Sequence, residues 1–306
     1  MEFPVSGVTV APWMPPLAAF VISFFTSMGG VSGAFLLLPF QMSVLGYTAP
    51  SVSATNHLFN IVAIPSGVWR YIREGRMVWP LTWVVVIATL PGVLIGAVVR
   101  VRYLPDPARF KLFAAAVLLY IGFRMLRELI AGRSKQPGGP TAEERFQKLV
   151  TNHRDEAGDL PKVRLLRFSL GRIEYSFYGE TYGFSTLGIF ALAFGVGIAG
   201  GIYGIGGGAI MAPFFVSVFG LPVYTVAGAA LMGTLVTSVA GVIFMVALGV
   251  GPDWLLGLLF GLGGAAGMYC GARVQKFVPA LAIKIMLVAV ILVTALRYVV
   301  AFLVTS

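Results

Sequence analysis

Two long tracts of this chain contain no charged side chain. No Lys, Arg, Asp or Glu occurs between Glu2 and Arg70, and none occurs between Glu180 and Asp253. A membrane-spanning helix needs about 20 apolar residues, so each tract has room for at least two such helices. Of all residues, 58% are hydrophobic and 11% are charged, whereas soluble domains carry about 25% charged residues. The chain is therefore predicted to be an integral membrane protein.

The apolar residues divide into eight candidate segments. In the first half they lie near 15–40, 48–69, 78–99 and 108–127, and in the second half near 185–219, 223–249, 254–272 and 280–303. The N-terminus has no basic region and its apolar run is too long for a signal peptide, so the first segment is expected to stay in the mature protein. The predicted fold class is all-α, a polytopic membrane helical bundle.

The two halves are repeats of one another. Gly33 and Gly207 are 174 residues apart (207 − 33), and seven further pairs of identical residues keep that separation. These pairs are Pro39/Pro213, Phe40/Phe214, Gly46/Gly220, Gly67/Gly241, Val68/Val242, Gly75/Gly249 and Pro105/Pro279, and Lys111/Lys284 and Arg124/Arg297 follow at 173 after a one-residue deletion. Chance seldom preserves one separation over so many glycines and prolines. We infer a duplication, with about four segments in each repeat.

A polar segment at 132–183 separates the repeats, which predicts three regions: membrane repeat 1 at 1–131, a small soluble insert, and membrane repeat 2 at 184–306. Alternation of polar and apolar residues at 172–177 and 181–184 predicts a β-hairpin in this insert, outside the membrane.

Other parts of the insert are less regular. Residues 134–140 have the Gly and Pro content of a linker, and 142–150 is a short helix candidate. We interpret the insert first as a connecting flap without a function of its own, because loops of this size are commonly structural.

The formal net charge of +10 would suit nucleic-acid binding if the basic residues were clustered. Thirteen of them instead lie at or near the ends of apolar segments, where Lys and Arg anchor helices to lipid headgroups. They are Arg70, Arg73, Arg76, Arg100, Arg102, Arg109, Lys111, Arg124, Arg127, Arg273, Lys276, Lys284 and Arg297. The expected partner is the lipid bilayer and not nucleic acid; a homo-oligomer is left open.

The orientation depends on the number of crossings in each repeat. Four crossings leave little charge bias in the first half, whereas an odd number inverts the second repeat relative to the first. Arg273, Lys276 and Lys284 then join the insert on one side and leave Asp253 on the other. This arrangement satisfies the positive-inside rule better, so we expect the insert in the cytoplasm.

The first segment of each repeat is predicted to be broken or re-entrant. Glycines at 29–33 and at 204–208 are each followed by a proline, Pro39 and Pro213. Gly33, Gly206, Gly207 and Gly208 are the candidate interruption residues, together with Ser32. Paired interruptions at matching places in two repeats indicate a transporter binding site, and a half-helix N-terminus favours an anion. The alternative is that these glycines only allow close helix packing.

A polar face on the second segment is the next candidate. Ser53, Asn56, His57 and Asn60 are spaced i, i+3, i+4 and i+7, which puts them on one face of a helix. Thr234, Thr237, Ser238 and Gly241 have the same spacing in the second repeat. Both faces could line a shared path, or could simply join helices by hydrogen bonds. His57 could serve a proton-linked step or remain a neutral donor, and both interpretations stay open.

Several residue types needed for other functions are missing. No predicted segment has a central Asp or Glu of the kind that binds Na⁺ or relays protons, which disfavours a cation transporter. Two His and the single Cys270 make a metal cluster or a catalytic centre improbable, and the glycine motif lacks the Lys of a phosphate-binding loop. We expect no catalytic residues, no metal and no cofactor.

The segment from Gly204 to Pro213, its copy at 29–39 and the duplicated four-segment plan resemble the sulfite exporter TauE/SafE family. The resemblance covers both apolar halves and implies a multi-pass inner-membrane permease that exports sulfite or organosulfonates. Ser32 replaces a glycine of the family motif, and Asn56 with His57 stands where the family often has Ser-Leu.

The predicted function is thus a permease for a small anion, namely sulfite, another sulfur oxyanion or an organosulfonate. The predicted substrate-binding residues are Ser32, Gly33, Asn56, His57, Asn60, Gly206, Gly207, Gly208, Thr234 and Ser238. A membrane scaffold or sensor acting through residues 132–183 is the alternative.

Overall fold

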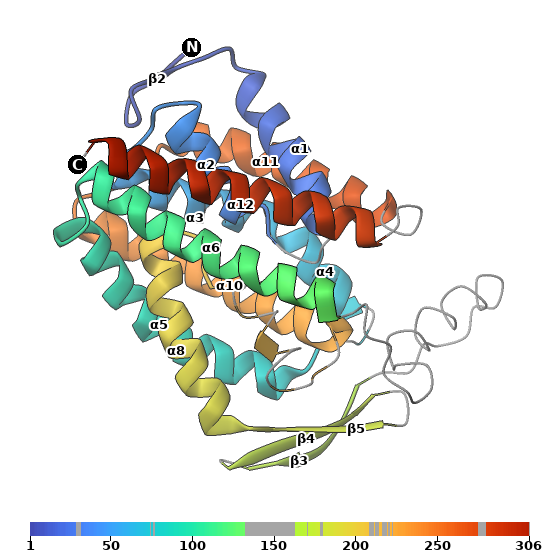
Figure 1. The fold of residues 1–306 in the computed structure, drawn as a ribbon. Coiled ribbons are helices and arrows are strands. Elements are labelled where there is room, and N and C mark those ends of the chain that lie inside the picture. Colours follow the sequence, from blue (N-terminus) through green and yellow to red (C-terminus); the bar gives the residue numbers. More distant parts are fainter. Residues whose placement is uncertain are drawn as a thin grey trace.

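The computed structural model describes residues 1–306 except 29–31, 74, 76, 132–162, 170, 178–179, 208–210, 212–213, 216–218, 220, 222, 275–279 and 306. Four described helices are long and apolar enough to cross a membrane: Trp79–Arg102, Thr186–Tyr203, Thr225–Ala247 and Trp254–Gly271. Three shorter apolar stretches accompany them, at Met14–Ser27, Ala34–Ser43 and Ile291–Val300. The predicted all-α membrane bundle is confirmed (Figure 1).

The first repeat follows a small N-terminal hairpin made of β1 (Glu2–Phe3) and β2 (Val8–Thr9). Its helices are α1 (Met14–Met28), α2 (Ala34–Ser43), α3 (Ser51–Ala63), α4 (Pro65–Arg73), α5 (Trp79–Arg102) and α6 (Pro107–Ala131). The second repeat contains α8 (Thr186–Tyr203), α10 (Val223–Ala247), α11 (Trp254–Val274) and α12 (Ala280–Thr305).

The sequence separation of the repeats carries over to the helices. Shifting α1 by 174 residues gives α8, and the same shift takes α5 to α11. The pair α3 and α4 together corresponds to the single helix α10. We expected one segment at 48–69, and the structure divides it at Pro65, because proline has no backbone N–H to continue the helical ladder. Val239 occupies the equivalent position in α10, which is unbroken.

The repeats are inverted relative to one another. A Cβ added at Gly241 of α10 would lie 2.7 Å from Nε2 of His57 on α3, and one added at Gly67 on α4 would lie 3.4 Å from Cδ1 of Leu231. From His57 to Gly67 the residue number rises along the first repeat, while that of the contacting residue in α10 falls from Gly241 to Leu231. The equivalent helices are therefore antiparallel. Helices α6 and α12, also equivalent, run in opposite directions side by side (Figure 1). The twofold axis relating the repeats is therefore perpendicular to the helices.

Helices are also exchanged between the repeats. The first helix of each repeat packs on the helix of the other repeat that forms its third predicted segment, α1 on α11 and α8 on α5. A Cβ on Gly267 would come within 2.3 Å of the carbonyl oxygen of Phe20, and one on Gly197 within 2.7 Å of that of Thr89. Spaced glycines allow such close contact between backbones. Tight packing thus explains part of the glycine content of α8 and α11.

The segment before α8 forms a three-stranded antiparallel sheet of β3 (Arg164–Phe168), β4 (Arg172–Phe177) and β5 (Glu180–Ser185). Strands β4 and β5 pair from Arg172↔Ser185 to Phe177↔Glu180, where alternation predicted a hairpin. Ile173, Tyr175 and Phe177 form the buried face of β4. The helix candidate at 142–150 lies outside the described residues.

A buried tyrosine joins this sheet to the helices. The hydroxyl groups of Tyr175 and Thr225, at the start of α10, are 2.8 Å apart. Burial raises the pKa of Tyr175 to about 12, so the phenol stays protonated at neutral pH. The sheet is thereby held against the end of the bundle.

Candidate functional site

Both predicted interruptions are present in the described residues. Helix α1 ends at Met28, and α2 begins at Ala34, with Gly33 as its N-cap. Helix α8 ends at Tyr203, and Gly204, Gly206 and Gly207 follow with φ of 84°, 67° and 81°. These left-handed backbone conformations favour glycine. Residues 29–31 and Gly208 lie outside the described residues, as does Pro213.

The second interruption also needs glycine for space. A Cβ at Gly204 would lie 2.5 Å from the carbonyl oxygen of Ser53, and one at Gly206 would lie 2.8 Å from Oγ of Ser238. The chain leaving α8 thus touches α3 at one glycine and α10 at another.

Four of the predicted site residues meet between the two interruptions. Oγ of Ser32 donates to Oδ1 of Asn60 at 2.8 Å, and Nδ2 of Asn60 donates to Oγ of Ser238 at 3.2 Å. Nδ1 of His57 is 3.4 Å from the same Ser238 oxygen. All four side chains are buried, and they connect the first interruption, α3 and α10. We call Ser32, Asn60, Ser238 and His57 the central polar cluster.

Asn56, another of the predicted site residues, has its side-chain amide bonded within the protein. Its Nδ2 donates to the carbonyl oxygens of Ala34, at 3.0 Å, and Gly204, at 3.1 Å, and its Oδ1 accepts from Nε2 of Gln41 at 3.4 Å. Both amide hydrogens are therefore used within the protein. Asn56 ties the start of α2 to the end of α8 and so braces the two interruptions against each other.

The remaining predicted residues lie beside the cluster. Thr234 donates to the carbonyl oxygen of Ala230 on its own helix at 2.8 Å, and its side chain packs against Gly206. Gly33 lies next to Ser23, whose Oγ would be 2.8 Å from a Cβ at that position. A Cβ added at Gly200 of α8 would lie 2.5 Å from the backbone nitrogen of Gly207, so these two glycines pack directly against each other.

Other side chains bind carbonyl groups that have no helical donor, at the second interruption and in α2, where Pro39 has no N–H for the carbonyl of Phe35. Thr237 donates to the carbonyl oxygen of Gly206 at 2.9 Å, and Tyr203 donates to that of Phe35 at 2.9 Å. Thr237 belongs to the polar face seen in the sequence, whereas Tyr203 gave no signal because tyrosine is common in apolar segments. These bonds satisfy backbone groups that would be costly to bury unpaired.

Arg100 is a buried charged residue near the site that the sequence analysis did not include among the candidates. We expected it at the membrane surface, and this expectation is wrong, because its side chain has 0% exposure. Its Nε donates to Oγ of Ser53 at 3.3 Å, and Nη2 donates to the carbonyl oxygen of Thr48 at 3.2 Å. Nη1 donates to the carbonyl oxygen of Leu104, and the guanidinium lies 3.7 Å from the ring centre of Phe110.

Arg100 is close to the second interruption and forms no ion pair with a described acid. Ser53, which accepts from it, donates to the carbonyl oxygen of Ile202 at 3.0 Å, just before Gly204. A signal existed in the sequence, since Gly92 and Gly96 contact α8 and Arg100 follows them on α5 at the same spacing of four residues.

Three polar atoms at or near the cluster are buried without a hydrogen-bond partner in the described part of the chain: Oγ of Ser23, Oε1 of Gln41 and Nε2 of His57. Buried polar groups are normally satisfied by protein, water or a ligand. Ser23 faces the first interruption, and Gln41 is bonded to Asn56. These atoms retain hydrogen-bonding capacity for a solute.

In the part of the chain that the structure describes, no group of three or more His, Cys, Asp or Glu could hold a metal ion. Among the described residues, Asp253 is the other buried charged side chain besides Arg100. Oδ2 of Asp253 accepts from the nitrogen and hydroxyl of Ser6 at 3.1 and 2.9 Å, and Oδ1 accepts from the nitrogen of Leu256 at 3.2 Å. This carboxylate therefore caps the start of α11, away from the central polar cluster.

Comparison with known proteins agrees with this architecture. The family model described as Sulfite exporter TauE/SafE matches residues 16–298, which include both repeats and the insert. No curated protein and no solved structure matches the chain. The chain belongs to the TauE/SafE sulfite exporter family of membrane transporters.

Proposed function

We propose that this protein is a permease that exports a small anion, either a sulfur oxyanion such as sulfite or an organosulfonate, across the bacterial inner membrane. The anion binds between the two interrupted segments, at the central polar cluster. The family is one of sulfite exporters, which supports the substrate class.

The observation that carries this proposal is the hydrogen-bonded chain from Ser32 through Asn60 to Ser238. It joins the interruption of one repeat to the helix that touches the interruption of the other. A buried row of hydroxyl and amide groups at this junction can exchange its internal bonds for bonds to an oxyanion. Gly206 lies directly against Ser238, so backbone groups of the second repeat are within reach of the same ligand.

The charges favour an anion over a cation. Among described residues, Arg100 and Asp253 are the buried charged side chains. The Asp253 carboxylate is bound by Ser6 and the start of α11, whereas Arg100 has hydroxyl and carbonyl partners that leave its charge uncompensated. An uncompensated guanidinium near the path raises the local concentration of anions.

The inverted repeats support alternating access. Two equivalent halves packed around a shared site can rock relative to each other and open it to either side in turn. The braces from Asn56 to Ala34 and Gly204 couple both interruptions, so one cannot move without affecting the other.

The orientation that we propose has the insert in the cytoplasm. Helix α8 follows the insert directly, α5 runs parallel to α8, and α11 runs opposite to α5 as its inverted equivalent. The end of α11, which carries the basic Arg273, is therefore on the side of the insert, and Lys276 follows it in the sequence. An excess of basic residues favours the cytoplasmic side.

The test combines binding with transport. Purified protein is heated in the presence of sulfite, thiosulfate, a short sulfonate, a carboxylate or chloride, and the anions that raise Tm are then offered to proteoliposomes. We expect stabilisation and flux for sulfite or a sulfonate and neither for the carboxylate. Flux of none of these anions, with the protein folded and correctly inserted, would overturn the proposal.

A further inference from the structure

Strand β3 is an exposed strand that combines apolar and basic side chains. All five residues from Arg164 to Phe168 are exposed, with Leu166 at 56% and Phe168 at 65%. A sheet edge with large apolar residues in water would invite aggregation unless something covers it.

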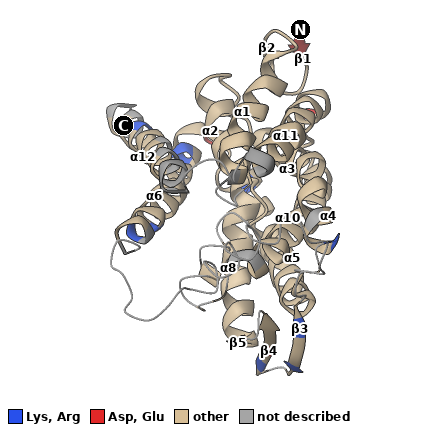
Figure 2. Ribbon diagram, turned by 90° about the vertical axis from the view of Figure 1, so that its right-hand side faces the viewer, with Lys and Arg blue, Asp and Glu red and all other residues tan. Residues whose placement is uncertain are grey.

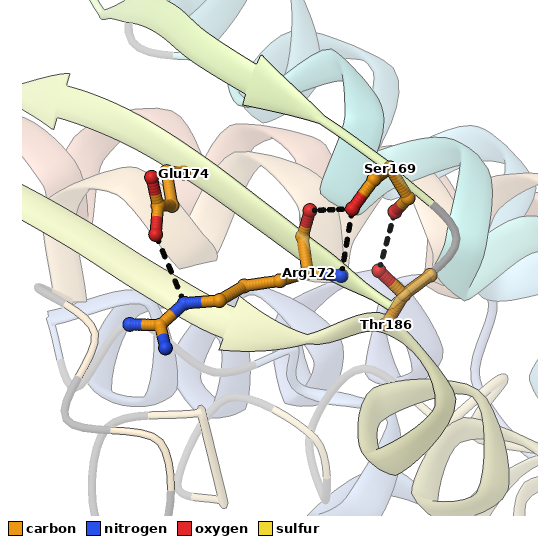
Figure 3. A network of polar contacts seen from close by, with 4 residues as sticks. All are labelled: Ser169, Arg172, Glu174 and Thr186. Atoms are coloured by element: carbon orange, nitrogen blue, oxygen red, sulfur yellow. Dashed lines mark hydrogen bonds and ion pairs between the residues drawn. The ribbon is translucent and has the colours of Figure 1, made fainter.

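Both ends of β3 are attached to the beginnings of membrane helices. At one end, the nitrogen of Val163 donates to the carbonyl oxygen of Gly75 at 3.2 Å, in the turn that leads into α5. At the other end, Oγ1 of Thr186, the first residue of α8, donates to the carbonyl oxygen of Ser169 at 3.1 Å (Figure 3). The nitrogen of Thr186 also donates to the carbonyl oxygen of Gly171 at 3.3 Å.

These attachments place β3 at one membrane surface. Helices α5 and α8 pack in parallel, so both begin on the same side of the bundle. The exposed Trp79 and Trp83 lie on the first turns of α5, and Leu187, at 72% exposure, lies on the first turn of α8. Tryptophan concentrates at the boundary between lipid tails and water. A strand bonded to both helix starts is therefore level with the lipid headgroups.

The charge of β3 suits anionic lipid. In this sheet Arg172 is paired with Glu174 at 3.0 Å (Figure 3), whereas Arg164 and Arg167 form no ion pair with a described acid. Figure 2 shows Lys and Arg on the sheet at the lower end of the bundle, below the start of α8. Basic residues at this depth attract anionic headgroups, while neighbouring apolar side chains enter the interface.

We propose that β3 is a binding edge for anionic phospholipid headgroups in the leaflet where α5 and α8 begin. Arg164 and Arg167 bind the phosphates, and Leu166 and Phe168 enter the interfacial region. This inference does not depend on which anion the protein transports.

The experiment uses the full chain in nanodiscs that contain a photoactivatable phosphatidylglycerol, or the matching phosphatidylcholine as the zwitterionic probe. After illumination, mass spectrometry locates the crosslinked peptides and gives their yields. We expect crosslinks at residues 164–168 with phosphatidylglycerol and few with phosphatidylcholine. Because one basic residue near the surface contributes about five-fold in lipid affinity, the double variant Arg164→Gln/Arg167→Gln should lose about 25-fold.

The matched control is Arg172→Gln, which removes one positive charge from the same sheet but from a side chain already paired with Glu174. Its crosslink yield on β3 should equal that of the wild type, and all variants should keep the wild-type Tm because the side chains are exposed. Equal yields for both lipids, or an undiminished yield in the double variant, would each overturn the inference.

Discussion

Asn60 on α3 and Ser238 on α10 are joined by a hydrogen bond of 3.2 Å across two antiparallel helices from different repeats. Asn60 also accepts from Ser32 at the first interruption, and Ser238 lies against Gly206 at the second. This one pair therefore connects both glycine-rich interruptions, and a ligand that separates its members would act on both repeats.

Replacing Asn56 should affect stability as well as transport. In Asn56→Leu the carbonyl groups of Ala34 and Gly204 lose their donor, and each unsatisfied buried carbonyl costs about 1–3 kcal/mol. We expect a lower Tm and no flux in proteoliposomes. The control is Thr9→Ala, which removes an exposed hydroxyl on β2 and should leave both quantities unchanged. A Tm equal to that of the wild type would show that Asn56 does not brace the interruptions.

Gly206→Ala should stop transport through strain and collision together. A non-glycine residue at positive φ costs roughly 1–3 kcal/mol, and the added Cβ would also meet Ser238 Oγ at 2.8 Å. Gly249→Ala is the matched control, because Gly249 has a φ of 80° but open space around its Cβ position. We expect Gly249→Ala to lower Tm slightly and keep flux. Equal flux in the two variants would contradict the assigned contact between Gly206 and Ser238.

The inverted packing makes a prediction about two equivalent glycines. Gly241→Ala puts a methyl group 2.7 Å from the His57 ring, and overpacking of this kind costs about 1–3 kcal/mol. Gly67→Ala, its equivalent, meets the flexible end of Leu231 at 3.4 Å. Thermal unfolding should show a clear loss for Gly241→Ala and little change for Gly67→Ala. The reverse order would be incompatible with this register between the first repeat and α10.

Arg100 should set the apparent affinity for the transported anion. Arg100→Gln removes the buried positive charge and retains an amide that can donate to Ser53, so we expect KM to rise about ten-fold, which corresponds to about 1.4 kcal/mol. Arg100→Lys should recover part of the loss because it restores the charge. Arg102→Gln serves as the control, since Arg102 is exposed two residues away. An unchanged KM in folded Arg100→Gln would remove Arg100 from the path.

Much of the fold follows from sequence patterns. The common separation of Gly33/Gly207 and its companion pairs indicates the duplication, and clusters of glycine before a proline indicate where the first segments break. The i, i+3, i+4, i+7 spacing brought His57 and Asn60 to one face, and the structure has both in the central polar cluster. Whether these residues bind the substrate stays a prediction, as do the boundaries of the three regions.

Other features depend on contacts that periodicity does not encode. Hydropathy does not tell whether a broken segment crosses the membrane or turns back. The inversion of the repeats therefore follows from the contacts between the first repeat and α10 and not from the sequence. Arg100 and Arg102 both lie at the end of an apolar segment in the sequence. Only the structure shows that Arg100 is buried and Arg102 is exposed. The bracing role of Asn56 depends on backbone carbonyl groups of two other segments, which spacing along its own helix does not reveal.

The most direct test of the central claim is the affinity for the transported anion of Asn60→Leu compared with the wild type. Anion-dependent thermal stabilisation and initial rates of proteoliposome flux should be measured on the same preparations, with Thr9→Ala as the control. The account predicts that Asn60→Leu remains folded and inserted but loses both the stabilisation and the flux. Stabilisation and flux at wild-type levels in Asn60→Leu would contradict it.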